Sequence, residues 1–347
     1  MCLNPSYIKN RKYIPNKKNG GIIPPILDNR VLMVPVGCGV CIECKKQKSR
    51  SWQIRLKEDI KRYKNPVFVT LTFSEQSLKS LRDDCKIIYG KNWIDDDNII
   101  CTLAVRRFLE RYRKKYKKSI RHWLISEKGH EGTKRIHLHG ILYIENKEEI
   151  EKFWKYGWVY LGDYVNNKTI NYIIKYVTKV DTVNKGFEGK IFCTAGIGRG
   201  WEKTLNAENS KYKGKDTKET YINEKGFEMG LPIYYRNKIY TEDEREKLWL
   251  NRLDKHERWV LGQKIDISNG LDEYENALHF ARILNNSMGY LNEKDFSSKK
   301  YLKQVKELNN INNDYILIKT PELLVNLDEM RHSVYFTFRS AIPACER

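Results

Sequence analysis

The sequence predicts an α+β fold, because segments that alternate like β-strands are interleaved with segments that repeat like α-helices. The strand-like segments are 67–73, 121–127, 135–144 and 158–164, and the helical segments are 45–63, 95–118, 147–156 and 169–179. Asn65-Pro66 ends the first helical segment. Gly129 and Gly132 lie in the turn between two strand-like segments, which we expect to pair as an antiparallel hairpin.

The chain of 347 residues divides into three parts by composition. We predict an N-terminal basic arm with a cysteine cluster at 1–64, the strand-and-helix domain at 65–200, and a mainly helical C-terminal region at 201–347. Helical patterns at 241–261, 271–288 and 299–311 support the last assignment. Residues 1–37 are expected to be loop-like and residues 203–230 linker-like.

Positive charge is the strongest bulk property. The formal net charge is +20 and the pI is about 9.4, which indicates a polyanionic partner, either nucleic acid or an anionic membrane surface. A mean hydropathy of −0.67 and no apolar run near the roughly 20 residues that span a bilayer argue against a membrane. The 22 tyrosines and 8 tryptophans favour single-stranded nucleic acid.

The segment Cys38-Gly-Val-Cys41-Ile-Glu-Cys44 offers three thiolates in one tight loop, a spacing typical of structural zinc sites. Cys2 is the candidate for a fourth ligand. The alternative is that these are ordinary reduced cysteines, and an iron–sulfur cluster is less favoured because nothing else in the sequence suggests redox chemistry. The uneven spacing of the eight cysteines argues against a disulfide framework and favours a reducing cytosol.

Two helical segments combine an apolar stripe with basic side chains, which could follow a phosphate backbone or only be solvated. The candidate DNA-binding residues are Lys45, Lys46, Lys48, Arg50, Arg106, Arg107 and Arg111. A glycine-rich turn at 196–200 is a weaker candidate for a phosphate contact. The chain contains no G-x-x-x-x-G-K-[ST] motif, so the sequence does not support an intrinsic P-loop ATPase.

The triplet His137-Leu138-His139 lies in a strand-like segment. Successive side chains of a strand point to opposite faces, so both imidazoles share one face while apolar side chains share the other. Two imidazoles on one face can bind a divalent metal; alone, they could equally be surface histidines. Glu127, near the end of the partner strand, is within diagonal reach of either histidine. A carboxylate beside two imidazoles favours Mg²⁺ or Mn²⁺, unless Glu127 only pairs with a lysine.

The segment 169–179 has isoleucines and a valine at helical spacing on one side and Tyr172, Lys175, Tyr176 and Lys179 on the other. It could be only an amphipathic helix. A tyrosine phenolate, however, is a nucleophile for phosphoryl transfer. Because a phenol has a pKa near 10, we expect the two lysines to lower that pKa or to stabilise charge on the phosphate.

Taken together, these motifs resemble those of rolling-circle replication initiators of the His-hydrophobic-His (HUH) endonuclease superfamily, in its two-tyrosine branch. They are most similar to the initiators of microviruses, especially the gokushovirus-like phages. The resemblance is carried by FVTLTF at 68–73, RIHLHGIL at 135–142, YIIKYVTK at 172–179, and the N-terminal MC with VPVGCGVCIEC. It covers roughly residues 1–200, with LPIYY at 231–235 as a weaker match.

The resemblance implies a central antiparallel sheet with packed helices, a metal on the sheet and tyrosines on a helix that faces it. It also implies nicking of origin DNA, a 5′-phosphotyrosyl link and a free 3′-OH that primes a host polymerase beside a host replication helicase, in the bacterial cytoplasm. His137 and His139 match the metal pair, Tyr172 and Tyr176 the nucleophiles, and Lys175 and Lys179 the motif lysines. The third ligand varies in the superfamily; here it is assigned to Glu127.

Other functions remain open at this stage. A plasmid or transposon-type nicking enzyme would share the chemistry, although the paired tyrosines and the cysteine arm favour the phage. A non-catalytic single-stranded-DNA-binding protein would explain the charge and the aromatics but not the histidine and tyrosine pairs. A metal hydrolase would not need the tyrosine helix, and a His-x-His-x-His nucleotidyl hydrolase would need a histidine at Ile141.

Overall fold

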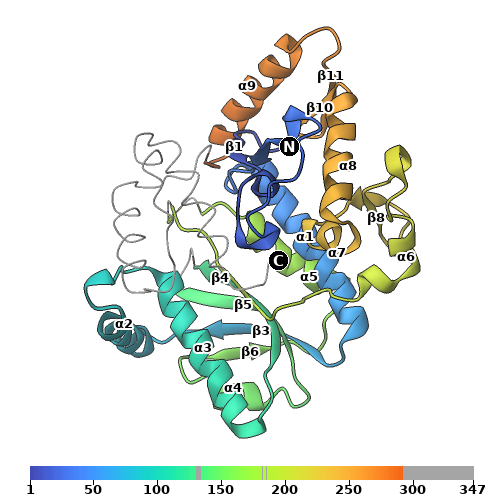
Figure 1. The fold of residues 1–347 in the computed structure, drawn as a ribbon. Helices are drawn as coiled ribbons and strands as arrows, with labels where there is room; N and C mark the ends of the chain where they lie inside the picture. Colours follow the sequence, from blue (N-terminus) through green and yellow to red (C-terminus); the bar gives the residue numbers. More distant parts are fainter. Residues whose placement is uncertain (130–133, 182, 185, 292–347) are drawn as a thin grey trace. The chain divides into compact units, whose positions relative to one another are not determined.

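The computed structural model describes residues 1–129, 134–181, 183–184 and 186–291 (Figure 1). The chain forms two compact units, one made of residues 1–47 with 201–347 and one of residues 48–200. Helix α1 (Ile42–Arg62) begins in the first and contributes its residues from Lys48 onward to the second. No helix among the described residues is long and apolar enough to cross a bilayer.

The 48–200 unit is built on a five-stranded antiparallel sheet with strand order β6-β3-β5-β4-β7. Its remaining elements are β3 (Pro66–Thr72), α2 (Glu75–Tyr89), α3 (Asp97–Tyr116), β4 (Arg121–Lys128), β5 (Ile136–Tyr143), α4 (Glu149–Phe153), β6 (Val159–Leu161), α5 (Asn167–Thr178) and β7 (Ile191–Cys193). The predicted α+β class and antiparallel sheet are confirmed. Helix α2 is not among the helical segments predicted from the sequence; Leu78, Leu81 and Cys85 bury one side of it.

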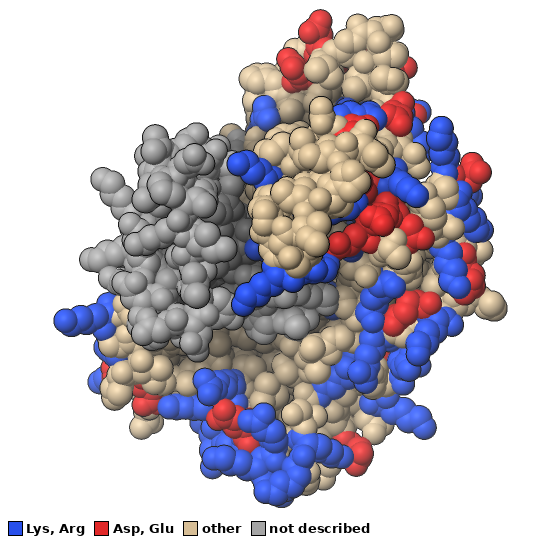
Figure 2. Space-filling model, viewed as in Figure 1, with Lys and Arg blue, Asp and Glu red and all other residues tan. Residues whose placement is uncertain are grey.

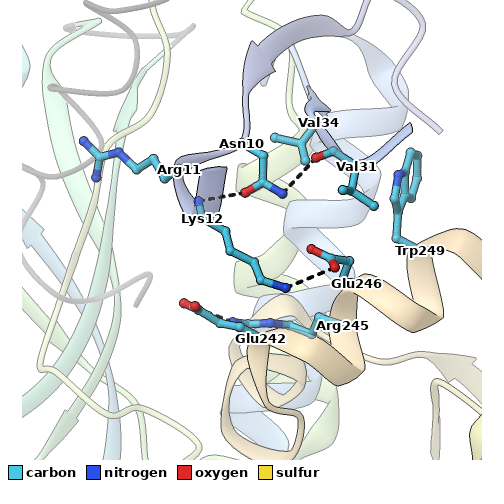
Figure 3. A pocket seen from close by; sticks show the side chains of 9 residues that line it. All are labelled: Asn10, Arg11, Lys12, Val31, Val34, Glu242, Arg245, Glu246 and Trp249. Carbon is cyan, nitrogen blue, oxygen red and sulfur yellow. Dashed lines mark hydrogen bonds and ion pairs between the residues drawn. The ribbon is translucent and has the colours of Figure 1, made fainter. Parts of the chain in front are cut away.

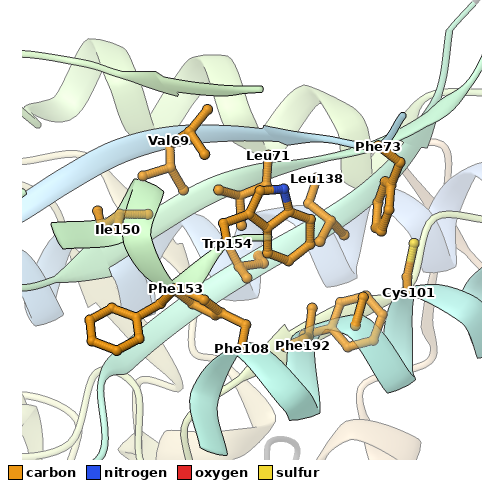
Figure 4. Close-up of a cluster of buried hydrophobic side chains, with 14 of the residues drawn as sticks. Val69, Leu71, Phe73, Cys101, Phe108, Leu138, Ile150, Phe153, Trp154 and Phe192 are labelled. Atoms are coloured by element: carbon orange, nitrogen blue, oxygen red, sulfur yellow. The ribbon is translucent and has the colours of Figure 1, made fainter. Parts of the chain in front are cut away.

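The main core lies between one face of the sheet and helices α2, α3 and α4 (Figure 4). Leu71 of β3 and Leu138 of β5 meet Phe108 of α3 and Trp154 after α4 in this cluster, and all four are almost fully buried. Val105 and Tyr112 of α3 are buried as its apolar stripe predicts, with Leu109 and Tyr116 packed at its edge. The apolar face of the His-x-His strand therefore anchors the sheet.

The opposite face of the sheet is covered by α5 and by the part of α1 that belongs to this unit. Trp52 of α1 packs against Trp123 of β4, with 5.8 Å between ring centroids, and the isoleucine stripe of α5 is buried. A buried ion pair joins the layers, because Asp59 of α1 accepts hydrogen bonds from the Arg121 guanidinium. The Gly198 amide also donates to Asp59, at 2.6 Å. The turn at 196–200 thus serves packing, and its Gly198 amide is engaged by protein rather than available to a phosphate.

The other unit is assembled from small hairpins and helices. Its elements are β1 (Ser6–Lys9), β2 (Met33–Val36), α6 (Leu205–Glu208), β8 (Thr220–Ile222), β9 (Glu228–Gly230), α7 (Ile233–Ile239), α8 (Glu242–Asp254), β10 (Glu257–Val260), β11 (Gln263–Asp266) and α9 (Asp272–Ser287). The β1–β2 and β8–β9 hairpins correct the expected loop and linker. The predicted helix at 241–261 ends at residue 254 and gives way to the β10–β11 hairpin. The pattern at 299–311 lies outside the described residues.

A small pocket of this unit, about 270 Å³ in volume, lies between the N-terminal segment and α8 (Figure 3). Lys12, in the lining of this pocket, is already paired, since its Nζ lies 2.9 Å from Asp243 and 3.0 Å from Glu246. Tyr13 donates a hydrogen bond to the same Glu246 at 2.9 Å. These contacts hold the arm against α8 and leave the pocket without a convergent set of ligand-binding groups.

Candidate metal and tyrosine site

The strand register brings Glu127, His137 and His139 together. In the β4–β5 pair Glu127 lies directly opposite His137 and diagonal to His139. The Glu127 Oε2 atom is 3.3 Å from His137 Nε2 and 3.0 Å from His139 Nε2. The three ligand atoms all lie within 4.8 Å of one another. Two imidazole nitrogens and a carboxylate oxygen therefore converge on one point of the sheet.

Neighbouring groups set the orientation of the two rings. His137 Nδ1 lies 3.2 Å from the Arg135 carbonyl oxygen, which can only accept, so Nδ1 carries the proton and Nε2 keeps its lone pair in the neutral ring. His139 Nδ1 lies 3.0 Å from the hydroxyl of Thr70, its partner across the β3–β5 ladder. Metal-binding histidines are generally held in this way through the second nitrogen. Acceptor atoms facing one another at 3.3 Å suit a cation between them, so the donor set fits a divalent metal.

The protonation states of Glu127 and His139 both favour metal binding. Burial alone would raise the pKa of Glu127, but its contacts with His137, His139 and Lys179 outweigh burial and hold that pKa well below its ordinary value. Burial lowers the pKa of His139, and this effect is only partly offset by contact with the Glu127 carboxylate. A carboxylate that stays ionised and an imidazole that stays neutral are the forms that ligate metals.

Helix α5 carries the two tyrosines across this centre. Asn166 begins the helix with a capping box that it forms with Thr169. Ile170, Ile173, Ile174 and Val177 are buried, so the opposite side of the helix presents the tyrosines and lysines. The period of the sequence thus determines which side of α5 is available for chemistry.

The Tyr176 ring is stacked on the His139 ring, with centroids 4.7 Å apart and planes 10° from parallel. Its hydroxyl donates to the Tyr172 hydroxyl at 2.6 Å. Tyr176 is half-buried, whereas Tyr172 is 43% exposed. The Tyr176 phenol therefore lies directly beside a histidine of the metal candidate, and the Tyr172 phenol lies next to Tyr176 and is more exposed to solvent.

The positions of Lys175 and Lys179 do not support the expectation that these lysines lower the pKa of a tyrosine. Lys175 lies over the Tyr172 ring, 4.1 Å from its centroid, and Lys179 forms an ion pair with Glu127. Burial, the hydrogen bond with Tyr172 and the charge of Glu127 raise the pKa of Tyr176 above its ordinary value. These contacts do not lower the pKa of Tyr176, which leaves stabilisation of phosphate charge as the role open to the lysines.

The seven candidate DNA-binding residues do not share one surface. Lys46, Lys48 and Arg50 are exposed on α1 and Lys45 is half-buried there. The three arginines lie on α3, which covers the face of the sheet opposite the histidines. Of these, Arg107 pairs with Asp84 and Arg111 donates to the Phe153 carbonyl at 2.9 Å, so both have packing roles.

The most basic surface in view lies instead over the end of α3 (Figure 2). Its exposed residues are Arg113, Lys114, Lys115, Lys117 and Lys118. These residues all lie within 113–118, so the run of basic residues in the sequence is the signal that would predict this basic surface.

The four N-terminal cysteines also converge, with every Sγ within 4.8 Å of the others. The Cys2–Cys41 and Cys38–Cys44 sulfur pairs are each 4.0 Å apart, close to the roughly 3.8 Å that tetrahedral zinc with Zn–S bonds of about 2.3 Å requires. Backbone amides of Asn4 and Cys38 donate to the Cys2 sulfur. A Cβ at Gly37 would lie 3.0 Å from the Cys44 sulfur, so a larger residue there would crowd the cluster. The donor set fits zinc.

Hydrogen bonds within the cluster redistribute its protons. Contact with Cys2 lowers the pKa of Cys38 to about 7 and lowers that of Cys41 further, while the pKa values of Cys2 and Cys44 are raised. Cys85 and Cys101 are buried elsewhere in the fold as thiols. In the part of the chain that the structure describes, the four clustered cysteines and these two are all free of disulfide bonds.

Comparison with known proteins gives one relationship, and it covers the segment that carries this site. No curated protein and no solved structure matches the chain. Residues 66–181, which run from β3 through the metal candidate to just beyond α5, match the family model of the replication-associated protein ORF2 family. This match links the sheet, the His-x-His strand and the tyrosine helix to proteins associated with replication.

Proposed function

We propose that this protein initiates rolling-circle replication by nicking origin single-stranded DNA with a tyrosine nucleophile beside a divalent-metal centre. The observation that carries the proposal is the stacking of Tyr176 on His139, which also contacts Glu127 and Thr70. A phenol beside convergent metal ligands is the pairing that phosphoryl transfer to tyrosine needs. The family match over 66–181 supports the same role.

The chemical step exchanges one phosphoester bond for another, so the number of phosphoester bonds does not change. The Oη atom of a tyrosine attacks the scissile phosphorus, a new Oη–P bond forms, and the bond from phosphorus to the 3′ oxygen breaks. The phenolic proton passes to solvent, and the departing 3′ oxygen takes up a proton. The products are a 5′-phosphotyrosyl link and a free 3′-OH, and the reverse transfer rejoins strands without ATP.

Each group at the centre has a distinct part in this step. Glu127, His137 and His139 would hold Mg²⁺ or Mn²⁺, which when bound would polarise and orient the scissile phosphodiester. Lys175, over the Tyr172 ring, is positioned to stabilise charge that develops on the phosphate oxygens. Tyr176, stacked on His139, is positioned as the attacking phenol.

Two tyrosines one helical turn apart allow two successive transfers, one releasing the strand that the other captures. This pairing, with the cysteine arm, supports the phage-type initiator of microviruses over a plasmid or transposon-type enzyme. In that setting the 3′-OH would prime a host polymerase, with a host replication helicase, in the bacterial cytoplasm. The four-cysteine cluster would hold a structural Zn²⁺ that ties residue 2 to the start of α1.

The test is to trap covalent adducts. The full chain is incubated with single-stranded DNA of its cognate genome and Mn²⁺, and the mixture is run on a denaturing gel. We expect an adduct that is lost in the Tyr172→Phe/Tyr176→Phe double variant and retained in Tyr89→Phe, an exposed tyrosine of α2 in the same unit. Tight, salt-sensitive binding without any adduct would instead favour the non-catalytic single-stranded-DNA-binding protein.

A further inference from the structure

A continuous series of aromatic rings leads from the edge of the sheet to the tyrosine pair. Trp158 and Tyr160 have ring centroids 6.0 Å apart. Tyr160 is 6.1 Å from Phe68 of β3, and Phe68 is 6.0 Å from Tyr172. We call Trp158, Tyr160 and Phe68 the aromatic track; it ends at Tyr172, which is 5.5 Å from Tyr176.

The track lies on the metal-binding face because of strand register. On β6 Tyr160 pairs with Thr70 of β3, and Thr70 pairs with His139 of β5. Val159 pairs with Leu71 on the opposite face and is buried in the main core. The alternation of side chains along a strand thus directs Tyr160 to the same face as His139.

These rings remain exposed although the backbone beneath them is well fixed. Trp158 is 65% and Tyr160 47% exposed. The Trp158 carbonyl accepts hydrogen bonds from both the amide and the hydroxyl of Thr72, at 2.9 and 2.8 Å. A Cβ at Gly157 would lie 2.5 Å from the Thr72 carbonyl oxygen, so the chain approaches β3 closely there. A preorganised, solvent-facing aromatic surface costs little further ordering when it binds a ligand.

Scattered exposed aromatics are common and need no explanation. Here the rings are contiguous, they stop at the residues proposed to attack phosphorus, and the Lys175 ammonium lies over the last ring. Flat rings in series beside a cation match a ligand that alternates planar bases with phosphates. The chemistry of the track therefore favours single-stranded DNA over a protein partner.

Building on the proposed function, we infer that the aromatic track stacks the bases flanking the scissile phosphate and so positions single-stranded DNA for attack. Trp158, Tyr160 and Phe68 are positioning residues; they form no bond to phosphorus. Loss of their rings should weaken DNA binding and raise KM, while kcat at saturating DNA changes little.

The test measures binding separately from chemistry. Full-length protein with Tyr172→Phe/Tyr176→Phe is titrated with short fluorescent oligonucleotides in EDTA, and anisotropy is read. Adding Trp158→Ala/Tyr160→Ala should weaken binding about tenfold or more, the usual scale for loss of stacked bases. The salt dependence should keep its slope, because no phosphate contact is removed. Trp158→Phe/Tyr160→Phe should restore most of the affinity, and Tyr89→Ala, an exposed ring outside the track, should have no effect.

Abasic sites in the oligonucleotide provide the second readout, and its first part uses only the protein with an intact track. Removing a stacked base should weaken binding to the protein with an intact track, and the same removal should cost the alanine variant little further. Equal losses in both proteins, or unchanged affinity of the alanine variant, would overturn the track. If DNA binding depends on the track but no covalent adduct forms, the aromatic track is supported and the proposed nicking activity is rejected. If the alanine variant forms adducts with a normal KM, nicking is supported and the aromatic track is rejected.

Discussion

The Tyr176 ring lies parallel to the His139 ring at 4.7 Å, whereas the Tyr172 ring meets His139 edge-on at 6.4 Å and is hydrogen-bonded to the Tyr176 hydroxyl. The two phenols are therefore not equivalent with respect to the metal candidate. We expect Tyr176 to make the first cut and Tyr172 to accept the strand in the second transfer.

This asymmetry predicts different defects in the single variants. Tyr176→Phe should lower the initial yield of adduct at least about 100-fold, the scale on which loss of one positioned catalytic group acts, with DNA binding within about twofold. Tyr172→Phe should still form the adduct but lose strand joining. Time courses with two differently labelled oligonucleotides separate cleavage from joining. Equal loss of the first cut in both variants would contradict the assignment.

The ion pair between Lys179 and Glu127 predicts an effect on metal affinity. A positive charge beside a carboxylate ligand opposes a divalent cation, so Lys179→Gln should bind Mn²⁺ more tightly by roughly three- to tenfold, equivalent to about 1 kcal/mol, the upper end of what solvent-screened ion pairs contribute. Glu127→Gln should instead weaken Mn²⁺ binding by more than about tenfold. Electron paramagnetic resonance of unbound Mn²⁺ measures both. A lysine variant with weaker affinity would argue that Lys179 orients Glu127 for the metal.

Buried His122 predicts how stability changes with pH. It is 9% exposed, and its Nδ1 atom is held by the Ile120 carbonyl and the Thr194 hydroxyl. Burial lowers its pKa in the folded protein, so below the ordinary imidazole pKa of about 6.5 the unfolded chain binds a proton that the folded chain does not. Stability should therefore fall as the pH drops below about 6.5. In His122→Asn the decline in Tm between about pH 7.5 and pH 5.5 should be smaller; a decline parallel to that of the unmodified protein would contradict this cause.

Local patterns predicted the chemical groups of the site better than their surroundings. Period-two alternation predicted that His137 and His139 share a face, and the expected hairpin placed Glu127 beside them. Both predictions succeed because they concern residues that are near one another in the sequence. The bond from Thr70 to His139 was not predicted, since it joins residues 69 positions apart through the strand order β3-β5. Pairing between distant strands has no signal in local periodicity.

Other differences arise because tertiary packing decides the role of charged side chains. Arg111 lies in a basic helix but donates to the Phe153 carbonyl, and only the fold reveals that use. The segment 203–230 is polar, yet it places Tyr221 in a buried position on a short hairpin. In both cases composition described the segment correctly but not the contacts that a few of its residues make.

The ion pair of Asp59 with Arg121 predicts a large effect on stability. Asp59 is fully buried and also accepts from the Gly198 amide. Asp59→Ala leaves the arginine and the amide without this acceptor, and removal of one partner of a buried pair typically costs about 3–5 kcal/mol. Asp163→Ala is the control, because this carboxylate pairs with Lys147 at the surface with its side chain 89% exposed. Urea denaturation should separate the two clearly, and similar midpoints for both variants would contradict a structural role for Asp59.

The cysteine cluster predicts one zinc per chain with a measurable effect on folding. Cys44→Ser should remove most of the zinc found by elemental analysis and lower Tm, because structural zinc contributes directly to the free energy of folding. Cys85→Ser is the matched control, since Cys85 is a buried thiol in the main core, where it could change packing but not metal content. A colourless protein with stoichiometric zinc would separate this centre from an iron site of the same geometry. Full metal content in Cys44→Ser, or an unmodified protein purified without bound metal and insensitive to added zinc, would show that the four thiols converge for packing alone.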